Sequence, residues 1–213
     1  MKRIAGIVAV LAIAFSPVFA RAFSFSEEAA KDRQAAQAKA AQVMENLSAP
    51  CKQALRGKTI AVLIAERSGG AIRVAGHGTL QQALNGQLAA LGLNTVPQSV
   101  ITARIAAAEM TAVLNNDPDA ALAASKRLGA NFFLKGVISS RAGENKMVRV
   151  NEVAVTIALT LTDGRGRTIS SRSIHAESWA GQDILGVAES LVEENGPVVV
   201  AEMYNDYCSR AGK

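Results

Sequence analysis

Residue types that could carry out chemistry are few in this chain of 213 residues, and they are scattered. There are two histidines, His77 and His175, and neither has another histidine or a cysteine at the spacing of a metal site. Serines and carboxylates are plentiful, but no Gly-x-Ser-x-Gly sequence marks an activated nucleophile. We therefore expect no catalytic residues, no metal ligands and no cofactor. His77 is the better functional candidate, because His175 lies in an alternating strand pattern.

A glycine-rich loop at 66–78 contains His77 and also Arg73. The run from Gly76 to Gln81 begins like a dinucleotide-binding fingerprint, but it ends in glutamine where a small residue is needed. A flexible turn before a helix that is capped by Thr79 explains the glycines without a ligand. If the loop does bind a ligand, the start of that helix favours an anion.

The amino terminus has the layout of a secretory signal peptide. Lys2 and Arg3 precede an apolar run at 4–15, which is shorter than the roughly 20 residues that a membrane-spanning helix needs. We expect cleavage after Ala20 or Ala22, so that the mature chain is periplasmic and has no membrane span. The absence of a cysteine at the cleavage point disfavours a lipid-modified amino terminus.

The cysteine count fits an oxidising compartment. Cys51 and Cys208 are the two cysteines, and an even number in an exported protein usually forms bridges. A redox-active pair is the rival interpretation, but it lacks the Cys-x-x-Cys spacing. We predict a structural disulfide that joins the segment before the first strand to the last helix.

The charge pattern argues against nucleic acid as a partner. The net charge is +5 and includes the two basic residues of the leader, and the remaining lysines and arginines are scattered. Aromatic residues make up 4% of the chain. Nucleic-acid binding typically shows clustered basic residues, often with aromatic residues that stack on bases.

The elements that must position these residues follow from hydrophobic periodicity. Helices are expected at 29–47, 79–91, 99–114, 118–128 and 183–208, and strands at 58–65, 93–97, 131–141, 147–162 and 167–179, with a short extended piece at 72–74. Apolar residues alternate with Ala and Thr through 147–162, which indicates an antiparallel sheet with one wetter face. Pro197 should kink the last helix or start a new one.

The expected fold class is α+β, or α/β with three layers. We predict a mixed sheet of about five strands with helices packed on one face, and a C-terminal portion of three antiparallel strands. The expected organisation is a signal peptide at 1–22, an N-terminal helical extension at 23–57 and a single domain at 58–213.

Four stretches carry a resemblance to a known family. They are 58–63, 91–96, 117–137, which runs from a capped helix through Leu-Gly-Ala into a strand, and 161–170. They resemble the domain shared by the amino-terminal part of the Tol-Pal translocation protein, curli secretion channel subunits and outer-membrane lipoprotein activators of penicillin-binding proteins. The resemblance covers roughly 58–192. It implies a noncatalytic envelope module that binds proteins or assembles complexes. The chain departs from that pattern because it lacks a lipidation cysteine and the extra hairpins of a pore.

The C-terminal strands offer a surface for such a role. An edge or face rich in Thr, Ser and Arg, including Arg172, can recruit another chain by strand addition. Trp179, the only tryptophan, is either an anchor for the partner or a cover for the sheet end.

Three functions therefore remain in competition. The first is a periplasmic, noncatalytic interaction module that supports a cell-envelope assembly, with an envelope protein of unknown identity as partner. An oligomer is compatible with this function. The second is a periplasmic small-molecule or glycan-binding protein that uses the loop at 66–78. The third is a hydrolase with scattered active-site residues.

Overall fold

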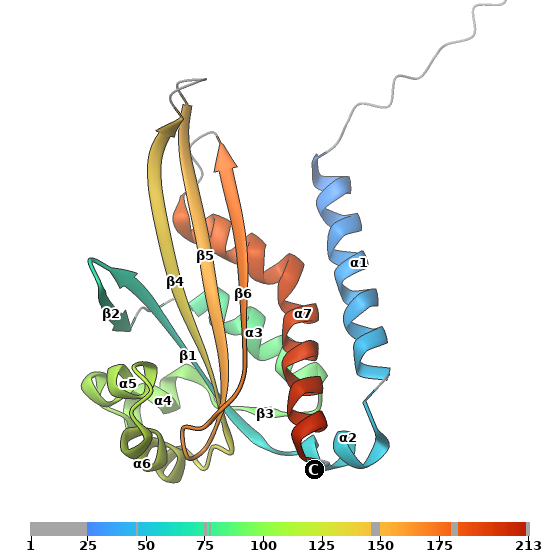
Figure 1. Ribbon diagram of the computed structural model, residues 1–213, viewed down its shortest axis with the longest axis vertical. Coiled ribbons are helices and arrows are strands. Elements are labelled where there is room, and N and C mark those ends of the chain that lie inside the picture. The colour runs from blue at the N-terminus through green and yellow to red at the C-terminus, as the bar shows by residue number, and fades with distance from the viewer. Residues whose placement is uncertain are drawn as a thin grey trace, which may run out of the picture.

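The computed structural model describes residues 25–45, 47–74, 76, 78–145, 150–179 and 183–211. The predicted signal peptide and both cleavage positions, Ala20 and Ala22, lie outside this part of the chain. Within the described residues the chain forms a mixed sheet with helices on it (Figure 1). The predicted fold class is confirmed, and no described helix has the length and apolar character needed to cross a membrane.

The sheet is ordered β2-β1-β4-β5-β6, and the short β3 also pairs with β1. The strands are β1 (Thr59–Ser68), β2 (Ala71–Val74), β3 (Asn94–Thr95), β4 (Phe132–Asn145), β5 (Val150–Asp163) and β6 (Thr168–Trp179). β1 is parallel to β4 and β3 and antiparallel to β2. The predicted antiparallel portion is confirmed, because β4, β5 and β6 pair antiparallel in sequence order.

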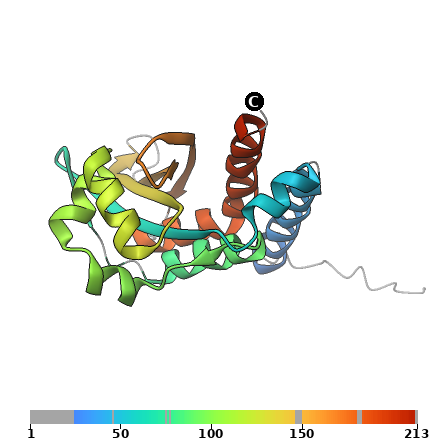
Figure 2. The ribbon, with the colours of Figure 1, turned by 90° about the horizontal axis from the view of Figure 1, so that it is seen from below.

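The helices gather in two groups (Figure 2). They are α1 (Phe25–Glu45), α2 (Ala49–Leu55), α3 (Gly78–Ala90), α4 (Gln98–Arg104), α5 (Ala107–Leu114), α6 (Pro118–Leu128) and α7 (Ile184–Ala211). Helices α4–α6 lie at the end of the molecule opposite α1 and α2. The longest helix, α7, runs next to α1.

Side-chain alternation in β1 builds a core on each face of the sheet. Ile60, Val62 and Ile64 face α3 and α7, whereas Ala61 and Leu63 face α4–α6. The expectation of helices on one face is therefore wrong around β1 and β4. It holds for β5, whose apolar residues lie under α7 and whose Ala and Thr residues are mostly half-buried or exposed on the other face.

Two details of the helix prediction also differ from the structure. The helix expected at 99–114 is two helices, because Ile105 adopts extended backbone angles between α4 and α5 while its side chain is buried. The helical extension expected at 23–57 contains a second helix, α2, in addition to the one placed at 29–47. Ser48 caps α2 by accepting a hydrogen bond from the Cys51 backbone N–H, and Pro50 lies in its first turn.

The strongest local signals are confirmed in α6. The Asp117 carboxylate accepts hydrogen bonds from the backbone N–H groups of Asp119 and Ala120, and Pro118 is the first helical residue. Gly129 ends the helix in the left-handed conformation at φ 65°, which glycine adopts at little cost.

Helix α7 is continuous through Pro197 and changes direction in its middle (Figure 1). A proline inside a helix removes one backbone hydrogen bond, which permits such a kink. The second half of α7 carries Cys208 to Cys51 in α2, and the predicted disulfide is confirmed with a Cα–Cα distance of 5.6 Å.

Candidate functional site

Two of the sequence-predicted contact residues, Arg73 and Arg172, lie in the strands at opposite edges of the sheet. Arg73 is exposed on β2, and Arg172 lies in β6. His77 and the side chain of Trp179 lie outside the described residues, and only the backbone of Trp179 is placed, opposite Glu152. Their roles as partner or ligand contacts stay predictions.

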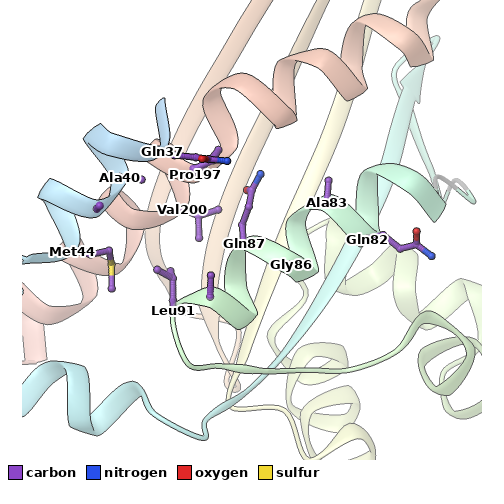
Figure 3. A pocket seen from close by; sticks show the side chains of 12 residues that line it. Gln37, Ala40, Met44, Gln82, Ala83, Gly86, Gln87, Leu91, Pro197 and Val200 are labelled. Atoms are coloured by element: carbon purple, nitrogen blue, oxygen red, sulfur yellow. The ribbon is translucent and has the colours of Figure 1, made fainter. Parts of the chain in front are cut away.

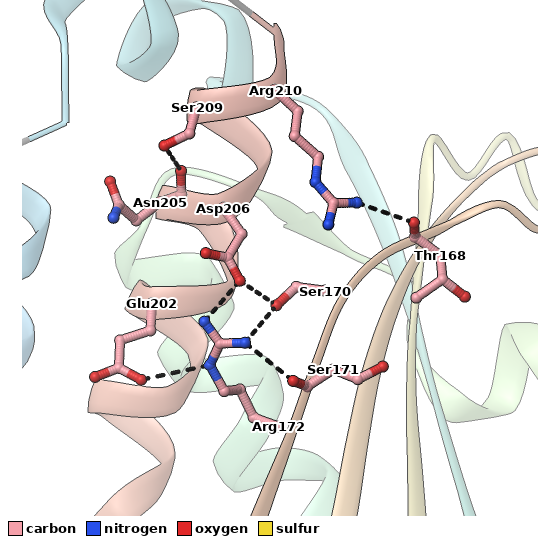
Figure 4. A network of polar contacts seen from close by, with 9 residues as sticks. All are labelled: Thr168, Ser170, Ser171, Arg172, Glu202, Asn205, Asp206, Ser209 and Arg210. Carbon is pink, nitrogen blue, oxygen red and sulfur yellow. Dashed lines mark hydrogen bonds and ion pairs between the residues drawn. The ribbon is translucent and has the colours of Figure 1, made fainter.

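Arg172 has a structural role that no sequence pattern indicated, because it links β6 to α7 (Figure 4). Its Nη2 lies 2.7 Å from Asp206 Oδ2, and its Nε lies 3.6 Å from Glu202 Oε2. Its Nη1 donates to the backbone carbonyl of Ser171 at 3.0 Å. The second half of α7 is thus fastened to the first half of β6, where Arg210 also donates to the backbone carbonyl of Thr168.

A hydroxyl, a histidine and a carboxylate meet on the wetter face of the sheet. His175 Nδ1 lies 3.1 Å from Thr156 Oγ1, and His175 Nε2 lies 3.4 Å from Glu177 Oε1. The His175 and Glu177 side chains are about half exposed, at 52% and 49%. A hydrolytic site needs a water-excluded cavity and donors for an oxyanion. This open arrangement is better explained as polar pairing within and between adjacent strands.

An apolar groove of about 610 Å³ lies between α1, α3 and α7 (Figure 3). Its lining consists of Gln37, Ala40, Ala41, Met44, Gln82, Ala83, Gly86, Gln87, Ala90, Leu91, Pro197 and Val200, of which none is titratable. Gln87 Nε2 donates to the Val192 carbonyl, and its Oε1 is buried without a partner among the described residues. Such a lining suits binding rather than proton transfer or nucleophilic attack.

A smaller cavity, of about 260 Å³, lies where the β1–β2 hairpin, the α5–α6 connection and the sheet meet. It is lined by Arg67, Gly70, Ile72, Leu114, Asn115, Asn116, Lys135, Val137, Ala158 and Thr160. Lys135 is only 3% exposed, and its Nζ donates to Asn116 Oδ1 at 2.5 Å. Burial lowers the pKa of the Lys135 amine, because desolvation disfavours the charged form.

No local sequence pattern predicts this cavity. Its main polar side chains come from distant parts of the chain, in β1, after α5, in β4 and in β5. One signal was present, because Lys135 is a single charge within the apolar strand run from Phe132 to Val137. A lysine in a strand that is buried on both faces needs a polar partner or a ligand. Within the described residues no cluster of three His, Cys, Asp or Glu side chains forms a metal site.

Comparisons with known proteins give a fold likeness only. No protein-family model matches the chain, and no curated protein sequence matches it. The lipoprotein GNA1162 from Neisseria meningitidis is 19% identical, with a TM-score of 0.42, over 70% of this chain and 99% of that one.

Two further solved structures show a likeness of the same degree. A PelC dodecamer from Paraburkholderia phytofirmans is 18% identical, with a TM-score of 0.39, over 67% of this chain and 87% of that one. The C-terminal domain of LpoB from Salmonella enterica is 15% identical, with a TM-score of 0.39, over 62% of this chain and 97% of that one. Scores this low carry no argument about function, and the resemblance to Tol-Pal and curli proteins stays a prediction.

Proposed function

We propose that the protein is a noncatalytic module, exported to the periplasm, that binds an extended segment of another envelope protein at the edge of its sheet. Export rests on the leader sequence at 1–22. The observation that carries the binding function is the edge strand β6, which is twelve residues long and pairs only with β5 among the described strands.

The two halves of β6 differ in how they are covered. Near its start, the carbonyls of Thr168 and Ser171 accept hydrogen bonds from Arg210 and Arg172. The far ends of β4, β5 and β6 rise above α7 (Figure 1). Long edge strands are normally blunted by charge, proline or a covering element, since their backbone groups pair readily with another chain. The stretch from Ser173 to Glu177 has neither proline nor lysine, and its one carboxylate, Glu177, lies at its end and pairs with His175.

The side chains of this stretch are compatible with a partner strand. Ser173, His175 and Glu177 are exposed and alternate with the buried Ile174 and the half-buried Ala176. In strand addition the backbone supplies the affinity and alternate side chains supply the specificity. The partner segment that fits is therefore extended, with polar residues over the wetter face of the sheet.

The test is site-specific photo-crosslinking in the envelope of the native host. A photoreactive residue is placed at Ser173 of the full chain, and a matched one at Lys126, which is exposed on α6. We expect Ser173 to crosslink to one exported protein, and the purified pair to reproduce the adduct. The Lys126 control should not form it.

A second variant separates edge pairing from mere proximity. His175→Lys puts a long charge on the edge, as natural edge strands do, and should abolish the Ser173 adduct while leaving the melting temperature nearly unchanged. An adduct that survives His175→Lys, or that joins two copies of this chain, contradicts the proposal. Hydrolytic turnover that depends on Thr156 or His175 would contradict the noncatalytic role.

A further inference from the structure

The cavity beside Lys135 has the composition of an anion site, and it lies next to β6, because its lining residues Ala158 and Thr160 pair with Ser173 and Ser171. Lys135 and Arg67 bring two positive charges to its wall, and Thr160 adds a hydroxyl. Ser171 Oγ donates to Thr160 Oγ1 at 3.3 Å, which leaves the Thr160 proton available to another acceptor. An ammonium, a guanidinium and a hydroxyl together are donors that match an oxyanion.

Among the described residues, no carboxylate forms an ion pair with Lys135 or Arg67. Lys135 has three N–H donors, and its one recorded acceptor is the amide oxygen of Asn116. A buried charge is costly unless it is paired, so a lysine that is 3% exposed as a residue and has only an amide partner favours a negative group as ligand.

Three acidic residues that are close in sequence to Arg67 or Asn116 either face away from the cavity or bind other groups. Glu66 precedes Arg67 in β1, and strand alternation places it on the opposite face of the sheet. The Asp117 carboxylate is occupied by the first turn of α6. Glu109 pairs with Arg127 at 2.8 Å. The end of α5, at Leu114 and Asn115, contributes only the partial negative charge of a helix C-terminus.

The backbone holds the amide in place. Asn116 is the one described non-glycine residue with positive φ, at 67°. Asparagine adopts this conformation more readily than most residues, and it turns the chain from α5 into the cap of α6. The tight turn therefore fixes the backbone that carries the Asn116 side chain, although the residue itself is exposed.

We propose that this cavity binds a small free oxyanion, either phosphate or a short carboxylate, between Lys135, Arg67 and Thr160. The volume of about 260 Å³ is just below the range typical of pockets for drug-sized ligands, so it suits a single charged group. The inference does not depend on strand addition at β6.

The test measures thermal unfolding of the disulfide-bonded mature protein in sodium phosphate, sodium acetate and sodium chloride at equal ionic strength. We expect phosphate or acetate at millimolar concentration to raise the melting temperature by about 2–5 °C above chloride, because a ligand that binds only the folded state stabilises it. Separate titrations show which of the two anions is preferred.

Three variants make the result specific. Lys135→Met keeps the length of the side chain and removes the charge, so it should melt higher than the wild type without an anion and lose the response to phosphate and acetate. Arg67→Gln should weaken affinity about 10-fold, the loss expected for one charge-assisted hydrogen bond. Lys126→Gln, which removes an exposed lysine on α6, should retain the full response.

A spectroscopic readout covers the case in which Lys135→Met does not fold. The pH midpoint of the Lys135 ¹³Cε resonance should rise when the preferred anion is present, because a bound negative charge favours the ammonium form. Equal melting temperatures in all three salts, an unchanged response in Lys135→Met or Arg67→Gln, or an unmoved midpoint would each overturn the proposal.

Discussion

At the scale of single residues, Asp163 is the best example of a side chain that shapes its surroundings. Its Oδ1 accepts the backbone N–H groups of Arg165 and Arg167, and its Oδ2 accepts from the Arg167 guanidinium at 2.7 Å. These bonds close the turn between β5 and β6. The sequence Asp163-Gly-Arg-Gly is typical of such a turn, and Gly166 N–H donates to the Asp163 carbonyl at 2.9 Å.

The same contacts give stability that depends on pH. Burial alone would raise the pKa of the Asp163 carboxyl, but the hydrogen bonds and the charge of Arg167 outweigh it, and the pKa lies below its usual value. A carboxyl with a lowered folded-state pKa stabilises the fold above its unfolded pKa of about 3.9, and this stabilisation disappears as the pH falls through the folded value.

We therefore expect Asp163→Asn to be less stable than the wild type at neutral pH. The difference should shrink steadily below about pH 4, because the wild-type carboxyl is then also neutral. Urea denaturation followed by circular dichroism across pH 2–7 measures both proteins. Asp119→Asn is the matched control, since it removes an exposed carboxylate. A constant difference at all pH values would show that the ionised form of Asp163 does not matter.

At the scale of elements, α1 is the least embedded helix. None of its described side chains is fully buried, and its contacts with α7 come mainly from alanines and from half-buried residues such as Val43 and Met44. The ion pair from Arg33 to Glu193, at 3.5 Å between half-exposed side chains, adds little. Helix α3, by contrast, buries Leu80, Leu84 and Leu88 completely.

This contrast predicts different local stabilities. The backbone amides of α1 should exchange with solvent deuterium on the order of 100-fold faster than those in the middle of α3, because local opening of α1 exposes little apolar surface. Hydrogen exchange monitored by mass spectrometry on the intact protein checks this. Ala40→Leu, which adds apolar surface in the groove, should slow exchange in α1 but not in α6. Equal protection in α1 and α3 would contradict this prediction.

Some features of the elements could be predicted from the sequence and others could not. Helix α6 could be predicted closely because Asp117, Pro118 and Gly129 act through the backbone of their own neighbours. The alternation of β5 predicted its two faces for the same reason. The break at Ile105 could not be predicted, since it depends on burying that side chain against distant helices. The cavity at Lys135 joins residues from four separate segments, so no local pattern reveals it.

At the scale of the whole molecule, one bond ties the two ends of the fold. The disulfide joins residues 157 positions apart and links α2, at the base of α1, to the end of α7. In the chain-entropy view a bridge over so long a loop restricts the unfolded chain strongly.

We expect Cys51→Ser combined with Cys208→Ser to lower the free energy of unfolding by about 4–5 kcal/mol. Urea denaturation measures the loss, and the wild type in excess reductant should behave like the double variant. The oxidised wild type should migrate faster on nonreducing electrophoresis and should show no thiol that can be alkylated. Reactive thiols in the native oxidised protein, or equal stability of the two forms, would contradict this prediction.

The parallel pairing of β1 with β4 has a consequence for the order of folding. Ile60 lies opposite Phe132, so this ladder must bring together segments that are 72 residues apart, whereas β4, β5 and β6 are joined by short connections. Loop-closure entropy makes distant pairings slower than hairpins. We therefore expect the meander of β4, β5 and β6 to form the folding nucleus. β1 is synthesised before these strands, but it should join the sheet after them.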